Sequence, residues 1–273
     1  MASADAQRFV QTMLLATEQA GAVARHLQGN VLAGEKSDMG SPEAAAVSVA
    51  DLATQDVLLL ALHHALPEAA VDAEEATEAV ALFPPPDPER PLAVLDPIDG
   101  SLNYLDLSVD YAVMAAWLEH GVYRAAVVHF PAWGETYWGI EGGGVWRRRS
   151  GEAERRVSLP APRPAALLVN SSLPRQTGEA LGRLGLELAT TRCSAVDSTA
   201  PLTGRARGSW VHGQPGRRRS IGFLLTHLAG GIVTIGGRRW AAEDPYTLAP
   251  GPSTTAADEE IAAALQGVFE ELS

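Results

Sequence analysis

Residues 96–104 read Asp-Pro-Ile-Asp-Gly-Ser-Leu-Asn-Tyr, and they come directly after the apolar run 92–95. Such a run is typical of a buried strand, so the acids that follow it are predicted to lie at a strand end. Asp96 and Asp99 flank a proline-stiffened turn and can converge on one point, where the carbonyl of Ile98 adds a neutral oxygen. Hard cations such as Mg²⁺ prefer this shell of oxygens and hold substrate phosphate as a further ligand. An ordinary Asp-Pro turn uses the same residues, so the surrounding sequence has to distinguish a metal site from a structural turn.

A second pair of acids follows another apolar run upstream. The run 70–73 ends at Glu74 and Glu75, which fits a second buried strand that delivers carboxylates at its end. A solvated pair of acids at a helix start is the alternative interpretation. Prolines at 84, 85, 86 and 88 separate the two runs and predict a loop between them. Two acidic strand ends in succession favour a shared cation site.

Helical periodicity marks both ends of the chain. Apolar residues at 9, 13, 16, 20, 23 and 27 recur at spacings of four and three, which predicts an amphipathic helix. The polar stretch 29–42 is expected to be a surface loop, and a second helix is predicted around Asp51 to Leu66, ended by Pro67. The last segment, 258–272, has early acids and apolar residues at helical spacing, so it predicts a third helix.

Between these helices the pattern changes to that of strands. Residues 111–118 and 122–130 are apolar and flank the turn Glu119-His120-Gly121, which predicts a β-hairpin, and residues 135–140 predict another strand. The first half of the chain is therefore interpreted as helices packed against an antiparallel sheet.

A polar, proline-containing segment from 147 to 164 suggests a soft boundary in this chain of 273 residues. We therefore expect an α+β domain with the metal site at residues 1–158 and a smaller α/β domain at residues 159–273. The elements predicted in the second domain are a strand at 166–169, a helix near 178–184 and a helix and strand within 222–235.

Composition excludes several classes of partner. The formal net charge of -12 and the pI near 5.0 oppose attraction to nucleic acid or an anionic membrane. No run approaches the roughly 18 apolar residues of a membrane span, and no leader pattern opens the chain. Cys193 is the single cysteine, so neither an internal disulfide nor a thiolate zinc cluster can form. We expect a cytoplasmic protein that binds a small molecule.

The acidic motifs match those of one protein family. Residues 96–104 resemble the metal-binding motif of inositol monophosphatases, and Ala73-Glu74-Glu75 resembles their Gly-Glu-Glu motif with glycine changed to alanine. Further resemblances lie at positions 36–37, 47–51, 127–144 and 224–231. The resemblance implies an α/β fold, a layered αβαβα sandwich with an antiparallel sheet in the N-terminal part and a smaller α/β part after it. It also implies a homodimer.

The resemblance assigns a role to each matching residue. Glu75, Asp96 and the carbonyl of Ile98 would hold a first Mg²⁺, and Asp99 would join Asp96 on a second. Ser101 takes the place of the hydroxyl that helps to orient the attacking water in the family. These are the predicted catalytic and metal-binding residues.

One family carboxylate is replaced by a guanidinium. The family has a Trp-Asp pair before its C-terminal helix, and counting back without a gap from residues 229–231 places that pair on Arg217 and Arg218. At about 4 Å and an effective dielectric near 20, two unit charges interact by roughly 4 kcal/mol. Repulsion from Arg218 would therefore disfavour a dication beside it by roughly 8 kcal/mol. We therefore expect one Mg²⁺ or none, and substrate binding by Arg218 together with Gly100 and Ser194.

Other departures concern the water and the substrate. The aspartate that partners the water-orienting hydroxyl is aligned with Ala45, which would leave Ser101 without an acidic partner. The substrate-facing Gly-Ser-Ala-Ala run of the family becomes residues 193–196, with one residue deleted before Asp197. A family glutamate that contacts the inositol ring aligns with Val211. Inositol phosphate is therefore not the expected substrate.

Three functions remain open. In the first, the chain is a phosphatase with weakened or changed activity on a small phosphorylated or otherwise anionic metabolite, in which Arg218 replaces the second cation. In the second, the fold serves non-hydrolytic chemistry or the binding of an anionic metabolite by Arg217, Arg218 and Arg219. In the third, it is an inactive paralogue that acts through assembly, and the acidic turn is only structural.

Overall fold

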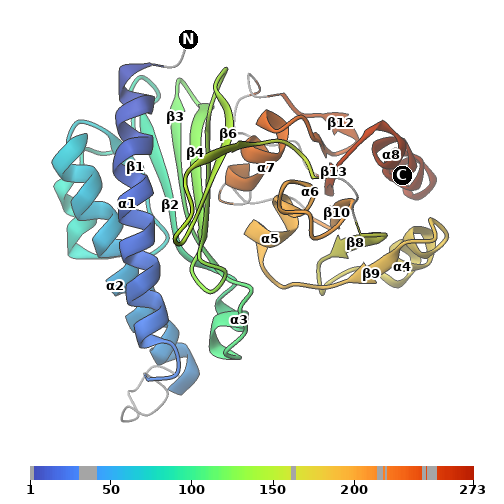
Figure 1. The fold of residues 1–273 in the computed structure, drawn as a ribbon, viewed down its shortest axis with the longest axis horizontal. Helices are drawn as coiled ribbons and strands as arrows, with labels where there is room; N and C mark the ends of the chain where they lie inside the picture. Colours follow the sequence, from blue (N-terminus) through green and yellow to red (C-terminus); the bar gives the residue numbers. More distant parts are fainter. Residues whose placement is uncertain are drawn as a thin grey trace.

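The computed structural model describes residues 3–30, 42–160, 164–213, 218, 220–241, 244 and 251–273, with the backbone alone for 42–48. Two β-sheets alternate with three helical layers, and Figure 1 shows the order from α1 and α2 on one side to α8 on the other. The predicted αβαβα sandwich is confirmed. Within the described residues, none of the helices is long and apolar enough to span a membrane.

The first sheet positions the acidic motifs. Its seven strands lie side by side in chain order, and β1 and β2 are parallel to each other while every later pair is antiparallel. Because parallel strands end at the same edge, the acids that follow β1 and those in β2 come together there. The strands are β1 (Ala70–Asp72), β2 (Leu92–Asp99), β3 (Ala112–Glu119), β4 (Val122–Phe130), β5 (Glu135–Ile140), β6 (Gly144–Arg149) and β7 (Arg155–Val157). The predicted hairpin and the strand 135–140 are confirmed.

One face of this sheet is covered by two long helices, α1 (Ala4–Leu27) and α2 (Pro42–Ala65). The periodic apolar stripe of α1 is buried as predicted, and the ring of Phe9 lies 5.3 Å from that of Trp117. The second helix begins well before the predicted start at Asp51. Proline is favoured in the first turn of a helix because its missing N–H is not needed there, so Pro42 opens the helix instead of belonging to the loop. Most of that predicted loop lies outside the described residues.

The second sheet is mixed, with strand order β12-β11-β13-β10-β8-β9. Helices α4 (Arg175–Gly182) and α8 (Glu259–Leu272) cover its outer face. Its strands are β8 (Ala166–Val169), β9 (Glu187–Ala189), β10 (Gly208–Val211), β11 (Ile232–Ile235), β12 (Arg238–Arg239) and β13 (Ser253–Ala256).

Short helices fill the layer between the sheets: α5 (Ser194–Ser198), α6 (Ala200–Thr203) and α7 (Ser220–Leu228). The packing of α5 against α7 is close, because a Cβ on Gly222 would lie only 1.9 Å from Ser198 Oγ. One buried cluster contains side chains of β3, β4, α5, α7 and β11, so the two sheets share this core.

The chain changes sheet between Val157 and Ala166. The boundary near Leu159 stays a prediction. The segment interpreted only as polar contains the end of β6 and all of β7, which lie at the edge of the first sheet.

Candidate active site

The acidic turn is part of β2 and not a loop after it. Asp96 pairs with Met114 and Asp99 with Ala112, so β2 carries one extra residue between these pairs, a β-bulge next to Pro97. A bulge redirects side chains by bending one strand against its partner. Here the bulge lets Asp96 and Asp99, on the same strand, contact different neighbouring residues.

Asp96 is the buried acid of the site. Its side chain is 5% exposed, and its Oδ1 has no hydrogen-bond partner among the described residues. Burial raises the pKa of Asp96 well above its usual range, the charges of Asp99 and Glu74 raise it further, and the charge of Arg218 lowers it. The nearby Arg218 therefore compensates the charge of this carboxylate only in part.

Asp99 is held by the start of α5. Its carboxylate accepts hydrogen bonds from Cys193 Sγ at 2.9 Å, from Ser194 Oγ and from the N–H of Ala195 at 2.6 Å. Burial and the adjacent Asp99 charge raise the pKa of the Cys193 thiol well above its usual range, so it remains a protonated donor. The predicted site residues Asp99 and Ser194 are thus brought together, but the hydroxyl of Ser194 is used by Asp99.

The glutamate pair is fixed through its backbone. Gln55 is fully buried, donates to the carbonyl of Glu75 at 2.7 Å and accepts from its N–H at 2.9 Å. Of the two glutamates, Glu74 is the one whose charge acts on Asp96. The charge of Glu75 acts on the buried Asp51. The proposed metal-ligand role of Glu75 stays a prediction, while the geometry makes Glu74 the nearer partner of Asp96.

Arg218 lies at the edge of this acidic cluster and joins the ends of β1 and β2. Its Nε donates to the carbonyl of Leu95 at 3.1 Å and lies 3.9 Å from Glu74, and its Nη2 lies 3.6 Å from Asp72. The side chain is 31% exposed. The guanidinium therefore combines a fixed position with access to solvent.

Gly100 and Ser101 form the turn after Asp99. Gly100 has a φ of +89°, and a Cβ there would lie 3.0 Å from the carbonyl oxygen of Asp110. Glycine is required for both reasons. Ser101 opens the short helix α3 (Ser101–Leu105), and its Oγ donates to the carbonyl of Ile98 at 3.3 Å. That carbonyl, one of the predicted metal ligands, is thereby oriented into the turn.

An acid that the sequence interpretation missed lies beside the glutamates. Asp51 in α2 is 4% exposed; burial raises its pKa to about 8, and the charges of Glu74 and Glu75 contribute. It falls within the stretch 47–51 that was matched to the family, which is the signal that could have identified it. The side chain of Ala45, on which the predicted loss of an acidic partner rested, is outside the described side chains, as are Arg217, Arg219 and positions 36–37.

The family resemblance implies Mg²⁺, and the donor set can be tested for it. The unpartnered Oδ1 of Asp96 and the raised pKa of its carboxyl fit one hard cation near Asp96 and Glu74. Mg²⁺ commonly takes one or two carboxylates and keeps several waters. No group of three or more His, Cys, Asp or Glu side chains arranged to hold a metal occurs among the described residues. The carboxylate oxygens of Asp96 and Glu74 are of the kind that Mg²⁺ binds, so these residues fit a bound cation.

Sequence comparisons identify related proteins. A model of the inositol monophosphatase family matches residues 5–198. A putative Nus factor SuhB of Neisseria meningitidis is 26% identical over 240 residues, which are 83% of this chain and 86% of that protein. A fructose-1,6-bisphosphatase/inositol-1-monophosphatase of Thermotoga maritima is 36% identical over 55 residues, which are 20% of this chain and 22% of that enzyme.

Solved structures agree with this fold over nearly the whole chain. The extragenic suppressor protein suhB of Bartonella henselae has a TM-score of 0.74 at 22% identity, covering 96% of this chain and 98% of that one. An inositol monophosphatase of Anabaena has a TM-score of 0.72 at 22% identity, with 98% and 97% covered. At these identities the likeness concerns the fold.

Proposed function

Because the chain belongs to the inositol monophosphatase family, we propose that it is a phosphatase-type enzyme with one cation site and a weakened or changed activity. Its substrate is a small phosphorylated or otherwise anionic metabolite. Family and fold support the phosphatase class. The residues of the site support the single cation site and the changed activity.

The observation that carries the proposal is the position of Arg218. Its Nε contacts the Leu95 carbonyl and Glu74, its Nη2 contacts Asp72, and the side chain is still 31% exposed. A guanidinium held in this way can bind a phosphate oxygen with its outer nitrogen, as planar forks do in proteins. It supplies one fixed positive charge at the edge of the acids without a second metal ion.

Asp96, Glu74 and the Ile98 carbonyl are the groups that would hold the cation, with Glu75 as a further candidate. A bound Mg²⁺ would supply Lewis-acid polarisation of a phosphoryl oxygen. Asp51 is kept protonated near neutral pH by burial and its acidic neighbours, so it can donate a hydrogen bond or a proton within the site. Ser101 holds the Ile98 carbonyl in place.

The substrate differs from inositol phosphate in this proposal. Val211 is 1% exposed within β10 and offers no polar group at the position aligned with a ring-contacting glutamate. The hydroxyl of Ser194 donates its hydrogen to Asp99 and so cannot donate it to a substrate. Recognition therefore depends more on Arg218 and the oxyanion than on a ring of hydroxyl groups.

Phosphate release tests this proposal. Purified protein is assayed with a panel of sugar and nucleotide monophosphates, with and without Mg²⁺, and calorimetry counts the bound ions. We expect one Mg²⁺ per chain and turnover of at least one ester that Arg218→Gln reduces about tenfold or more. Arg175→Gln is the matched control, because Arg175 is 93% exposed and pairs with Glu179 on α4. Absence of turnover across the panel would rule out the hydrolase.

A second candidate function is the binding of an anionic metabolite without hydrolysis. It is supported by Asp99, whose carboxylate is used by three donors at the start of α5. In that case, ligand raises the melting temperature in the absence of divalent metal, and Arg218→Gln removes the increase. A ligand effect that requires Mg²⁺ would favour the enzyme instead.

Assembly is the remaining part of the proposal. We infer a homodimer from the family, and the third possibility, an inactive paralogue that acts through assembly, requires a stable oligomer. Light scattering on the purified chain measures this directly. A monomer at micromolar concentration would exclude the assembly function while leaving the enzymatic one intact.

A further inference from the structure

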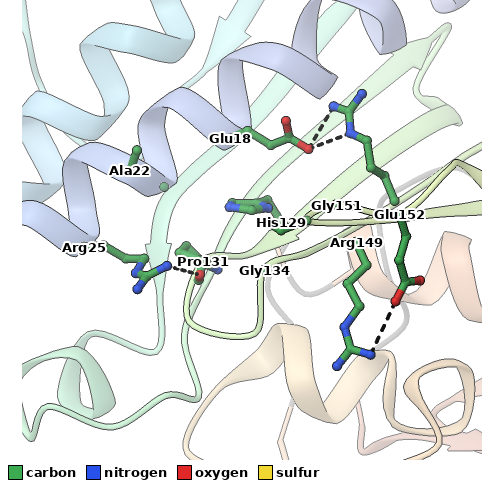
Figure 2. Close-up of a pocket in the computed structure, with 12 residues that line it drawn as sticks. Glu18, Ala22, Arg25, His129, Pro131, Gly134, Arg149, Gly151 and Glu152 are labelled. Atoms are coloured by element: carbon green, nitrogen blue, oxygen red, sulfur yellow. Dashed lines mark hydrogen bonds and ion pairs between the residues drawn. The ribbon is translucent and has the colours of Figure 1, made fainter.

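A second cleft, of about 470 Å³, opens between α1 and the turns that follow β4 and β6 (Figure 2). That volume is in the range of small-molecule sites. The cleft lies on the opposite face of the first sheet from Asp96. His129, which lines the cleft, pairs with Val113 of the α1-covered face, whereas Asp96 pairs with Met114 on the other face. The cleft is therefore separate from the candidate active site.

The floor of the cleft is a fixed and neutral histidine. His129 is 8% exposed, and burial lowers its pKa to about 4. Thr136 Oγ1 donates its one hydrogen to Glu18 at 2.8 Å, so it can only accept a hydrogen bond from His129. Its 2.9 Å contact with His129 Nδ1 therefore places the ring hydrogen on Nδ1. Nε2 is left as the acceptor of the ring. Glu18 is itself held by Arg148 at 2.8 Å, which fixes the chain of contacts.

Gly21 makes room for this ring. A Cβ at position 21 would lie 2.5 and 2.7 Å from Cδ2 and Nε2 of His129. Contacts this short do not occur, so any larger residue would push the imidazole from the helix surface. The bare backbone at Gly21 allows the histidine to lie against α1 at the base of the cleft.

The walls of the cleft carry excess positive charge. Arg25, Arg148 and Arg149 line it together with two acids, Glu18 and Glu152. This is a local excess on a chain of net charge -12.

Two of these arginines differ in how they are engaged. Arg25 donates to the carbonyl of Pro131 at 3.3 Å, and no acid within the described residues forms an ion pair with it. Arg149 is half-exposed, with Glu135 at 3.3 Å and Glu152 at 3.8 Å. Figure 2 shows Arg25 and Arg149 on either side of the turn that contains Pro131 and Gly134.

From this geometry we propose that the cleft binds a small metabolite that carries both an oxyanion and a hydroxyl group. The oxyanion, a phosphate monoester or a carboxylate, pairs with Arg25, with which no acid among the described residues forms an ion pair. The hydroxyl group donates to Nε2 of His129. A neutral acceptor beside a cation selects such a ligand over an anion without a hydroxyl group, such as sulfate, because that anion leaves Nε2 of the histidine unpaired.

Binding is measured on the full-length chain carrying both Asp96→Asn and Arg218→Gln, without divalent metal, so that neither the buried acid nor the guanidinium of the candidate active site contributes. Glycerol 3-phosphate and glycerate are the two probes, and inorganic sulfate is the comparison, because it is an anion without a hydroxyl group. The readouts are calorimetric affinity and the ¹³Cε1 signal of His129. We expect a shifted His129 signal and tighter binding of at least one hydroxylated probe than of sulfate, and the better probe tells phosphate from carboxylate.

Matched substitutions localise the binding. Arg25→Gln should weaken it about tenfold or more, as expected for loss of a charged hydrogen-bond partner, while Arg175→Gln leaves it unchanged. Melting curves verify that Arg25→Gln is folded, which its single contact with Pro131 allows. An unshifted His129 signal, or equal affinity in Arg25→Gln and Arg175→Gln, would overturn the proposal. Because the assay needs neither metal nor turnover, its result is independent of phosphatase activity.

Discussion

The Nε of Arg218 donates to the backbone carbonyl of Leu95, one residue before the buried Asp96. A cation is thereby fixed beside the strand end where the acids meet. The same contact explains why the charge of Arg218 lowers the pKa of Asp96 while burial, Asp99 and Glu74 raise it. A side chain thereby neutralises part of the acidic cluster.

Arg218→Gln should destabilise the metal-free protein by about 1 to 3 kcal/mol, because it removes a charged hydrogen bond and leaves acids uncompensated. The loss should be greater at pH 8 than at pH 5, where more carboxyls are protonated. Urea unfolding at the two pH values measures it. Equal stability of the Arg218→Gln and Arg175→Gln variants would contradict the role of Arg218.

Asp96→Asn should have opposite effects on stability and function. Asp96 has a raised pKa, so between its unfolded value near 3.8 and its folded value the native state binds more protons and stability falls as pH rises. Removing that carboxyl should stabilise the metal-free chain by about 1 kcal/mol or more at pH 8. The increase in melting temperature produced by Mg²⁺ should disappear. A destabilised Asp96→Asn protein that still responds to Mg²⁺ would be inconsistent with both expectations.

His129 should make the protein acid-sensitive. Its folded pKa, about 4, lies below the unfolded value of 6.5, so between these values the unfolded state binds more protons and stability falls as pH decreases. The difference corresponds to about 3 kcal/mol lost between pH 6.5 and 4. In His129→Asn the slope of unfolding free energy against pH should be shallower over this window. The exposed His26 gives the control substitution, His26→Asn, whose slope should match the wild type.

Gln55→Leu tests the support of the glutamate pair. The substitution leaves the N–H and carbonyl of Glu75 without their buried partner, which should cost about 2 kcal/mol or more. It should also weaken Mg²⁺ binding, since Glu74 and Glu75 lose their fixed backbone. Chemical denaturation and calorimetry measure the two effects, with Gln11→Leu on the exposed side of α1 as control. Unchanged Mg²⁺ affinity would contradict a role of Glu74 and Glu75 in binding the cation.

The sequence was informative where local pattern and fold agree. The apolar stretches of β3 and β4 on either side of a turn and the stripe of α1 were sufficient to predict those elements, and the motif at 96–104 identified the family. The arrangement inside the site was less accessible. Which of Glu74 and Glu75 approaches Asp96 depends on the clamp by Gln55, a contact between distant elements. The commitment of Asp99 to α5 depends on how the layers pack, which no local spacing encodes.

The three donors that converge on Asp99 would compete with any ion for its carboxylate. An ion that bound this carboxylate would deprive a thiol, a hydroxyl and a backbone N–H of their acceptor at once. The middle helices and the first sheet are pinned together through the same oxygen atoms. Binding of an ion to Asp99 and the packing of α5 on the first sheet would therefore be coupled, because both depend on the same carboxylate.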